Sequence, residues 1–179
     1  MTTESASWVL SAPSANEYAE YYHTYVGKVP AGNILEILEN ELGDTLDLFQ
    51  SIPEGRGTYR YAEGKWSIKE VFGHVIDTER VFALRCLAFA RGDPNAFPSF
   101  EQDDYVKATN FGARTLADLS EEFQHVRHAN LVLFRSLTDE EMARRGIASG
   151  VEFSARSIPY VLAGHEIHHK KTLRERYLG

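Results

Sequence analysis

Two histidines near the C-terminal end of the chain have the spacing of a metal site. His165 and His169 lie four residues apart in the hexapeptide GHEIHH, which begins at residue 164. On an α-helix this spacing puts both side chains on one face, with their Cβ atoms about 5–6 Å apart. Two imidazoles placed in this way can ligate one divalent ion. His168 points about 100° away from His165 around the same helix and is not expected to be a ligand.

Two ligands are too few for a stable site, and His74 is the best candidate for a third. Ile158 and Leu162 share the stripe of His165, so this face of the helix is expected to point inward. Imidazoles buried there without a partner would be costly, and a shared metal ion removes that cost. Facing helices of a bundle bring ligands together by such convergence. Solvated or hydrogen-bonded roles suit the remaining histidines better, namely His23, His125 and His128.

Two other kinds of metal site fit the sequence less well. His165, Glu166 and His169 match the HExxH pattern of zinc peptidases. Those enzymes also need a third ligand downstream and a strand beside the site, but only ten residues follow His169 and none is a histidine. A ferritin-like di-iron centre needs Glu-x-x-His on two helices, whereas Glu70 and His74 are spaced by four.

Three charged residues near the predicted ligands have candidate roles. Asp77, one helical turn beyond the histidine at position 74, and Glu166 could orient a ligand or transfer a proton. Each could equally be a surface or salt-bridging carboxylate. Arg85 lies about three turns further along the stripe of the same predicted ligand. We expect it either to bind an anionic group of a substrate or to pair with an acid such as Glu79 or Asp103.

Hydrophobic periodicity and capping signals predict four long helices that would position these residues. Asn33 is the expected N-cap of the first helix, and Ser67 with Glu70 fits a capping box at the start of the second. The expected ranges are 34–52, 67–91, 115–137 and 158–177. Shorter features are expected at 18–25 (a tyrosine-rich helix across the bundle), 139–144 (a short helix after a second capping box) and 146–156 (an irregular or short extended turn).

The connection over residues 94–114 is long and rich in aromatic side chains. A connection of this kind often covers a site. The alternative is a loop that its aromatic residues pin to the core. Because four long amphipathic helices stand beside almost no strand signal, the sequence predicts an all-α four-helix bundle. We expect one domain over residues 1–179, with residues 1–12 flexible or loosely packed.

Composition and charge exclude several classes of function. Hydrophobic residues make up 43% of the chain and charged residues 25%, as in folded globular proteins. The net charge of −7 argues against nucleic acid or an anionic membrane as the main partner. Neither a signal peptide nor a run of about 18 apolar residues is found. The lone Cys86 suggests a reducing compartment, so we expect a soluble cytoplasmic protein.

Three segments of the chain resemble one protein family. Residues 66–80, WSIKEVFGHVIDTER, look like the second-helix motif of the DinB-like (YfiT-like) metalloenzymes. Residues 164–169, GHEIHH, are similar to the fourth-helix motif of that family, and residues 98–106 resemble one branch of it. The likeness extends from about residue 18 to residue 178, and the two histidine motifs occur in the family's order.

The resemblance implies a DinB/YfiT-like four-helix bundle, often a homodimer, with one divalent ion at the three histidines selected above. Zinc, nickel, manganese and iron all suit imidazole ligands, so the ligands do not choose among them. The implied function is that of a hydrolase or a thiol-dependent transferase acting on a small-molecule substrate at an open metal position. The alternative is a non-catalytic, stress-response bundle whose structural ion has a fourth ligand from Glu101, Asp103 or Asp104.

Overall fold

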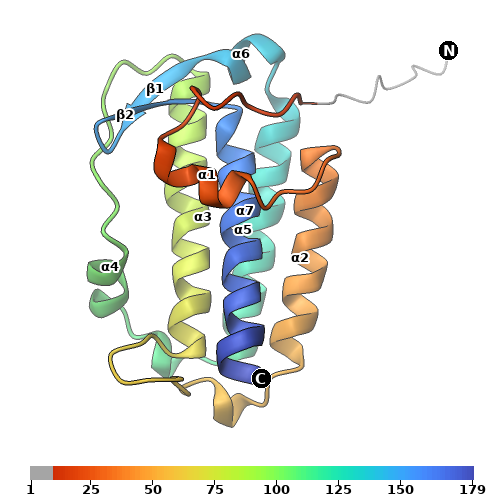
Figure 1. Ribbon diagram of the computed structural model, residues 1–179, viewed down its shortest axis with the longest axis vertical. Helices are drawn as coiled ribbons and strands as arrows, with labels where there is room; N and C mark the ends of the chain where they lie inside the picture. The colour runs from red at the N-terminus through yellow and green to blue at the C-terminus, as the bar shows by residue number, and fades with distance from the viewer. Residues whose placement is uncertain (1–9) are drawn as a thin grey trace, which may run out of the picture.

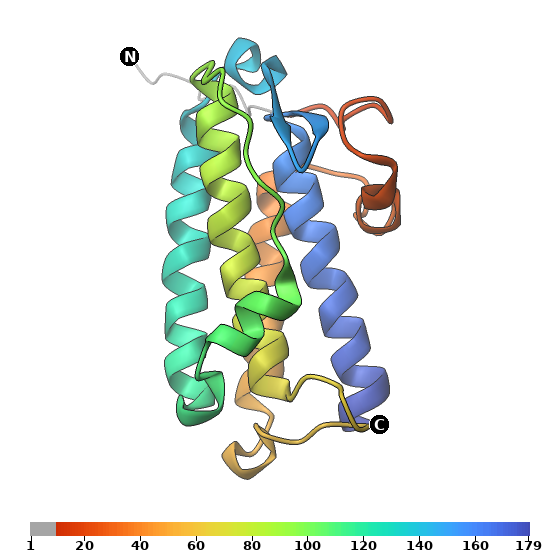
Figure 2. The same ribbon diagram turned by 90° about the vertical axis from the view of Figure 1, so that its left-hand side faces the viewer.

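Four long helices run side by side along the longest axis of the protein (Figures 1 and 2). The structure is a computed structural model, and it describes residues 10–179. The helices are α2 (Ile34–Gln50), α3 (Ile68–Ala90), α5 (Leu116–Ser136) and α7 (Ser157–Thr172), and α7 continues as the π-helical turn η4 (Leu173–Leu178). The predicted all-α four-helix bundle is confirmed.

The ends of the long helices follow the capping residues expected from the sequence. The side chain of Asn33 accepts a hydrogen bond from the backbone of Leu35 at the start of α2. Ser67 and Glu70 form both bonds of the capping box at the start of α3. At the start of α5 the side chain of Thr115 accepts one hydrogen bond, from the backbone N–H of Asp118. These local bonds satisfy backbone N–H groups that the first helical turn leaves without partners.

Shorter elements connect and cover the bundle. They are η1 (Glu20–Tyr22), α1 (His23–Val26), η2 (Glu54–Arg56), α4 (Gln102–Ala108), η3 (Phe111–Ala113), α6 (Asp139–Ala143), β1 (Arg145–Ala148) and β2 (Val151–Ser154). The segment expected to be irregular or a short extended turn is an antiparallel hairpin, whose turn places Ser149 and Gly150 at positive φ. The tyrosine-rich segment forms η1 and α1 and lies across the bundle, as expected (Figure 1).

A polar layer divides the core of the bundle into two apolar clusters. One cluster contains Leu38, Phe82 and Leu162, and the other contains Leu42 and Phe72. Buried polar residues of α3, α5 and α7 lie between the two clusters along each helix: Thr78, Glu79, Arg127, Asn130, His165 and Glu166. This layer is where the candidate site lies. In the described part of the chain, no helix has both the length and the hydropathy to span a membrane.

The expected loose packing of residues 1–12 falls mainly on residues that the structure does not describe. Of the described remainder, Leu10 is buried, and its carbonyl oxygen accepts a hydrogen bond from the hydroxyl of Tyr160. The chain therefore packs on α7 from Leu10 onward, before it reaches η1 and α1.

A glycine allows α1 to approach α7 closely. A Cβ atom at Gly164 would lie 2.1 Å from the carbonyl oxygen of Tyr25. No side chain can be accommodated at that distance without moving the backbone of α1. Gly164 directly precedes His165, so α1 is packed beside one of the predicted ligands.

We predict that Gly164→Ala displaces α1 from the bundle and destabilises the protein by about 1–3 kcal/mol, the usual cost of overpacking. Hydrogen exchange of residues 20–29 and thermal unfolding measure the two effects. The matched control is Gly43→Ala, at an exposed position of α2 where a Cβ atom meets nothing within 4 Å. This control is expected to stabilise by about 0.5–1 kcal/mol. Unchanged exchange at residues 20–29 in Gly164→Ala would contradict the prediction.

Candidate metal centre

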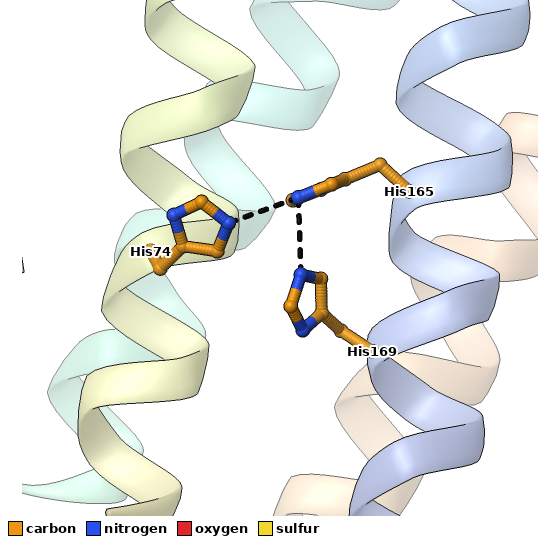
Figure 3. A group of neighbouring side chains, drawn as sticks. All are labelled: His74, His165 and His169. Carbon is orange, nitrogen blue, oxygen red and sulfur yellow. Dashed lines mark hydrogen bonds between the residues drawn. The ribbon is translucent and has the colours of Figure 1, made fainter. Parts of the chain in front are cut away.

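Three imidazoles from two helices converge in the polar layer. The Nε2 atom of His165 lies 2.9 Å from that of His74 and 3.1 Å from that of His169 (Figure 3). Their ligating atoms all lie within 4.8 Å of one another. α3 supplies the first of these residues and α7 the other two, four residues apart on one face. His168 does not belong to this group, and its ring packs edge-on against Tyr25.

Burial keeps these imidazoles in the neutral form. His74 and His165 are 2% and 7% exposed. Desolvation lowers the pKa of His74 to about 4. Desolvation also holds the pKa of His165 and of His169 well below the ordinary value, and the neighbouring histidines add to the effect. Neutral imidazole is the form that binds a metal ion, so no proton has to be displaced near pH 7.

The spacing of the nitrogen atoms fits a divalent ion. Imidazole nitrogens bound about 2.0–2.1 Å from one tetrahedral ion stand about 3.3 Å apart. The two contacts of His165, at 2.9 and 3.1 Å, need to lengthen by only a few tenths of an ångström to reach that separation. Three neutral nitrogen donors that converge from two helices therefore suit such an ion in both chemistry and geometry.

Aromatic rings surround the imidazoles and set their orientation. The ring of Phe100 lies nearly parallel to that of His74, with 6.1 Å between the ring centroids. The ring of Trp66 also packs on His74, with 4.9 Å between the centroids. Tyr25 of α1 meets His165 edge-on at 5.5 Å. These contacts hold the histidines by packing and leave their Nε2 atoms facing one another.

The connection over residues 94–114 both covers the site and is pinned by its aromatic residues. It runs down the outside of α3 (Figure 2). Phe100 covers His74, whereas Phe111 packs so closely on Gly73 that a Cβ atom there would lie 2.4 Å from the ring. Both expectations for this connection thus describe part of it.

Two cavities of about 300 Å³ each flank the histidine cluster. The first cavity is reached by His74 and His165, and the tyrosines of η1 and α1 form much of its wall. The second is reached by His169, beside Trp66 and Tyr177. Gln102, the first residue of α4, lines both cavities. The cluster is therefore accessible to small molecules from two sides.

Glu166 faces the interior of the bundle. Its carboxylate accepts hydrogen bonds from Thr45 at 2.5 Å and from Arg127 at 2.7 Å. Arg127 is completely buried and also binds Glu79 through two nitrogen atoms, at 2.6 and 3.3 Å. Burial raises the pKa of Glu166, and the charge of Arg127 opposes that effect. This carboxylate is held by residues of α2 and α5, whereas His165 of α7 faces His74 of α3.

Asp77 lies in a different environment, at the half-buried edge of α3. Burial raises the pKa of its carboxyl, Arg80 and Arg114 lower it, and Glu122 raises it further. Among the described residues no hydrogen bond joins Asp77 to His74. The structure therefore brings the three histidines together. The two predicted acids lie on the same two helices as the histidines but outside the cluster of ligating atoms.

The sequence interpretation missed Arg127 and Asn130, two residues of the polar layer on α5. Arg127 shares an apolar stripe of α5 with Phe123, Leu131 and Phe134, each spaced by four or by seven. A charged residue on such a stripe indicates a buried ion pair. Arg127 binds Glu79, one of the two acids suggested as partners for Arg85, so Glu79 is not available to Arg85. The other, Asp103, forms no ion pair with Arg85 among the described residues.

A sequence model of the DinB superfamily matches residues 37–173. The chain belongs to the DinB superfamily. The family resemblance inferred from the two histidine motifs is thereby confirmed. None of the curated proteins matches this DinB-superfamily chain by sequence.

Solved structures share the fold of this DinB-superfamily protein at low sequence identity. YfiT from Bacillus subtilis, described as a probable metal-dependent hydrolase with an unusual four-helix bundle topology, is 14% identical, with 92% of each chain covered and a TM-score of 0.64. A mycothiol-dependent maleylpyruvate isomerase is 11% identical, with a TM-score of 0.65. The match covers 81% of this chain and 61% of the isomerase chain. YjoA, a DinB-like protein from Bacillus subtilis, is 21% identical, covering 80% and 87%, with a TM-score of 0.58.

We predict that acid destabilises the metal-free protein through these histidines. The pKa of His74 is about 4 in the folded protein against an ordinary value of 6.5, so the unfolded chain binds more protons between these values. The free energy of unfolding should therefore be greatest above about pH 6.5 and should fall toward about pH 4, by up to about 3 kcal/mol for this residue. Chemical denaturation after EDTA treatment measures the slope.

Two variants test the origin of this pH dependence. His74→Gln should flatten the slope, whereas His125→Gln, at an exposed position of α5, should leave it unchanged. An equal slope in wild type and His74→Gln would contradict the assignment.

Proposed function

We propose that this protein is a metal-dependent enzyme acting on a small molecule, either as a hydrolase or as a thiol-dependent transferase. The convergence of three neutral imidazole nitrogens between two cavities is the observation that carries the proposal. The description of YfiT as a probable metal-dependent hydrolase supports the first reaction type. The description of the isomerase as mycothiol-dependent supports the use of a thiol in this fold.

One divalent ion would be held by His74, His165 and His169. Zinc, nickel, manganese and iron are all suitable ions. Bound by three neutral ligands, such an ion keeps its full charge and an open position, where it activates water or a thiol or polarises a carbonyl. The protein contributes a fixed arrangement of ligands. Phe100 and Trp66 also limit the access of water to the first imidazole.

The two cavities favour a reaction between two bound molecules. One cavity meets the cluster at His74 and His165, and the other meets it at His169. A nucleophile and its acceptor that entered from opposite sides would meet beside the three imidazoles. Holding two reactants together in this way gives the rate advantage of proximity. This arrangement supports thiol transfer more than simple hydrolysis, since water needs no cavity of its own.

Asp77 and Glu166 are proposed to assist in different ways. Glu166 acts as a positioning residue for α7, because Thr45 and Arg127 occupy its oxygen atoms. Asp77, one turn from His74 on α3, stays the candidate for proton transfer, and burial raises the pKa of its carboxyl. The expected homodimer and cytoplasmic location stay predictions.

The alternative, a stress-response bundle with a structural ion, needs a fourth protein ligand. Within residues 10–179 the group of converging ligand atoms contains the three histidines alone, and Glu101, Asp103 and Asp104 lie outside it. An open coordination position is therefore the arrangement that the donor set supports.

We predict that the protein, purified without a histidine tag, contains about one equivalent of a divalent metal per chain. His165→Ala should abolish this content, because two ligands bind too weakly to survive purification. His168→Ala, three residues away on α7, is the matched control and should retain the metal. Plasma mass spectrometry gives the content, and equal values in wild type and His165→Ala would refute the site.

The second prediction concerns activity. Metal-loaded protein is expected to turn over at least one substrate from a panel of esters or of pairs of low-molecular-weight thiols and electrophilic acceptors. EDTA or His165→Ala should remove that activity, and added metal should restore it only to the EDTA-treated wild type. Complete inactivity of the metal-loaded protein toward the panel would favour the non-catalytic interpretation.

A further inference from the structure

Arg85 is a buried cation without a carboxylate partner. It is 3% exposed. In the described part of the chain no acidic oxygen lies within ion-pair distance of its guanidinium, although the other strongly buried cations, Lys69, Arg127 and Lys170, each have such a partner. A buried charge without a counter-ion is costly, and burial accordingly lowers the pKa of Arg85.

Only part of the hydrogen-bonding capacity of Arg85 is used. Its Nη2 atom donates to the carbonyl oxygen of Pro98 at 2.8 Å. The structure shows no protein acceptor for Nε or Nη1 within residues 10–179, and neither atom is among the polar atoms that are completely sealed from solvent. The Nη2 atom carries a second N–H, and it forms one edge of the guanidinium with Nε and another with Nη1. Whichever edge faces Pro98, the other edge therefore remains available to a bound molecule and matches the two oxygen atoms of a carboxylate.

The position of this guanidinium places it beside the first cavity. It lies over the ring of Phe82, 4.9 Å from the centroid, and Phe82 lines that cavity. Pro98, which it binds, directly precedes the lining residue Ser99. Its charge also opposes the rise that burial causes in the pKa of Tyr22, another lining residue. Two contacts and one electrostatic effect thus place the cation directly behind residues that line the cavity.

Arg85 shares a face of α3 with the predicted ligand His74. The two residues are eleven positions apart, which corresponds to about 16 Å along the axis. Helical side chains lean toward the N-terminus, so the guanidinium leans back toward the histidines. Thr78 lies between them on the same face, and its buried Oγ1 atom has no partner among the described residues. It lines the cavity as a further polar contact.

We propose that the first cavity binds a small molecule through a carboxylate group that pairs with Arg85, with the rest of the molecule extending along α3 toward the three histidines. The inference rests on the proposed function, since it names the class of substrate that would reach the metal. A single guanidinium suits a monoanion better than a phosphate dianion, which would need more positive charge. Tyr22, Phe82 and Phe100 favour an apolar or aromatic body on this molecule.

The acidic residue that lines the first cavity does not pair with Arg85. Glu101 lines the same cavity, but it is exposed and forms no ion pair with Arg85. A carboxylate that enters past Glu101 meets one repulsive charge before Arg85 neutralises it. This arrangement would select for molecules whose carboxylate is at one end.

Calorimetric titration of the protein, as purified and after EDTA treatment, tests the proposal. The probes are acetate, benzoate and 3-phenylpropionate, each paired with its neutral amide. We expect at least one carboxylate to bind at least about tenfold more tightly than its amide, in both metal states. Arg85→Gln should lower the affinity for that carboxylate by about tenfold or more, which is typical for the loss of a charged hydrogen bond. The affinity of Arg85→Lys for the same carboxylate should lie between those of wild type and Arg85→Gln.

A matched control and a stability measurement make the result decisive. Arg80→Gln, at an exposed position of the same helix, should bind the carboxylate like wild type. Removing an unpaired buried cation should leave the melting temperature equal or higher, so a large decrease in both Arg85 variants would identify a structural residue and overturn the proposal. Equal affinity for acid and amide, no binding of any probe, or unchanged affinity in Arg85→Gln would also overturn it.

The outcome is separable from the fate of the metal site. The EDTA-treated arm does not need a metal, so Arg85-dependent binding in a protein that retains no metal would refute the proposed function alone. A protein that retains metal and turns over substrates, but binds carboxylates independently of Arg85, would refute the present inference alone.

Discussion

The buried ionic group around Arg127 is the interaction on which the arrangement of the bundle depends. All four long helices take part, through Thr45, Glu79, Arg127 and Glu166. Breaking a buried ion pair on one side typically costs about 3–5 kcal/mol, because a charge is left uncompensated. Glu166 adjoins His165 on α7, and Glu79 lies five residues beyond the α3 histidine on its helix. The ion pairs of Glu79 and Glu166 with Arg127 therefore fix the rotation of α3 and α7 about their axes. This rotation turns the imidazoles of the two helices toward one another.

Local signals explain why much of the fold was predictable from the sequence. The cap at Asn33 and the capping box at Ser67 depend on neighbouring residues, so they mark helix starts wherever the helices finally pack. The same holds for His165 and His169, whose spacing settles their common face. The partners of Glu166 and Arg85 could not be predicted in this way. These partners depend on which faces of distant helices meet. The hairpin after α6 also depends on distant contacts, because its strand β1 pairs with the connection over residues 94–114.

Each of the two ligand helices carries a glycine directly before a histidine. Beside Gly73 the missing side chain leaves room for the ring of Phe111, and beside Gly164 it leaves room for the backbone of Tyr25. The glycines thus let two segments from outside the bundle pack against the helices at the level of the imidazoles. The histidine nitrogens are thereby enclosed by these segments, so no additional long helix is needed to cover them. The same segments place aromatic rings beside the imidazoles.

The outer wall of the first cavity has a consequence for how such proteins diversify. Tyr21, Tyr22 and Tyr25 come from η1 and α1, which contribute no residue to the ionic group between the long helices. Side chains in this short segment can change without disturbing the pairs on which the bundle depends. Selection or engineering can therefore alter the shape of the cavity through Tyr21 and Tyr22, while Tyr25, which packs on His165, stays with the histidines and their scaffold.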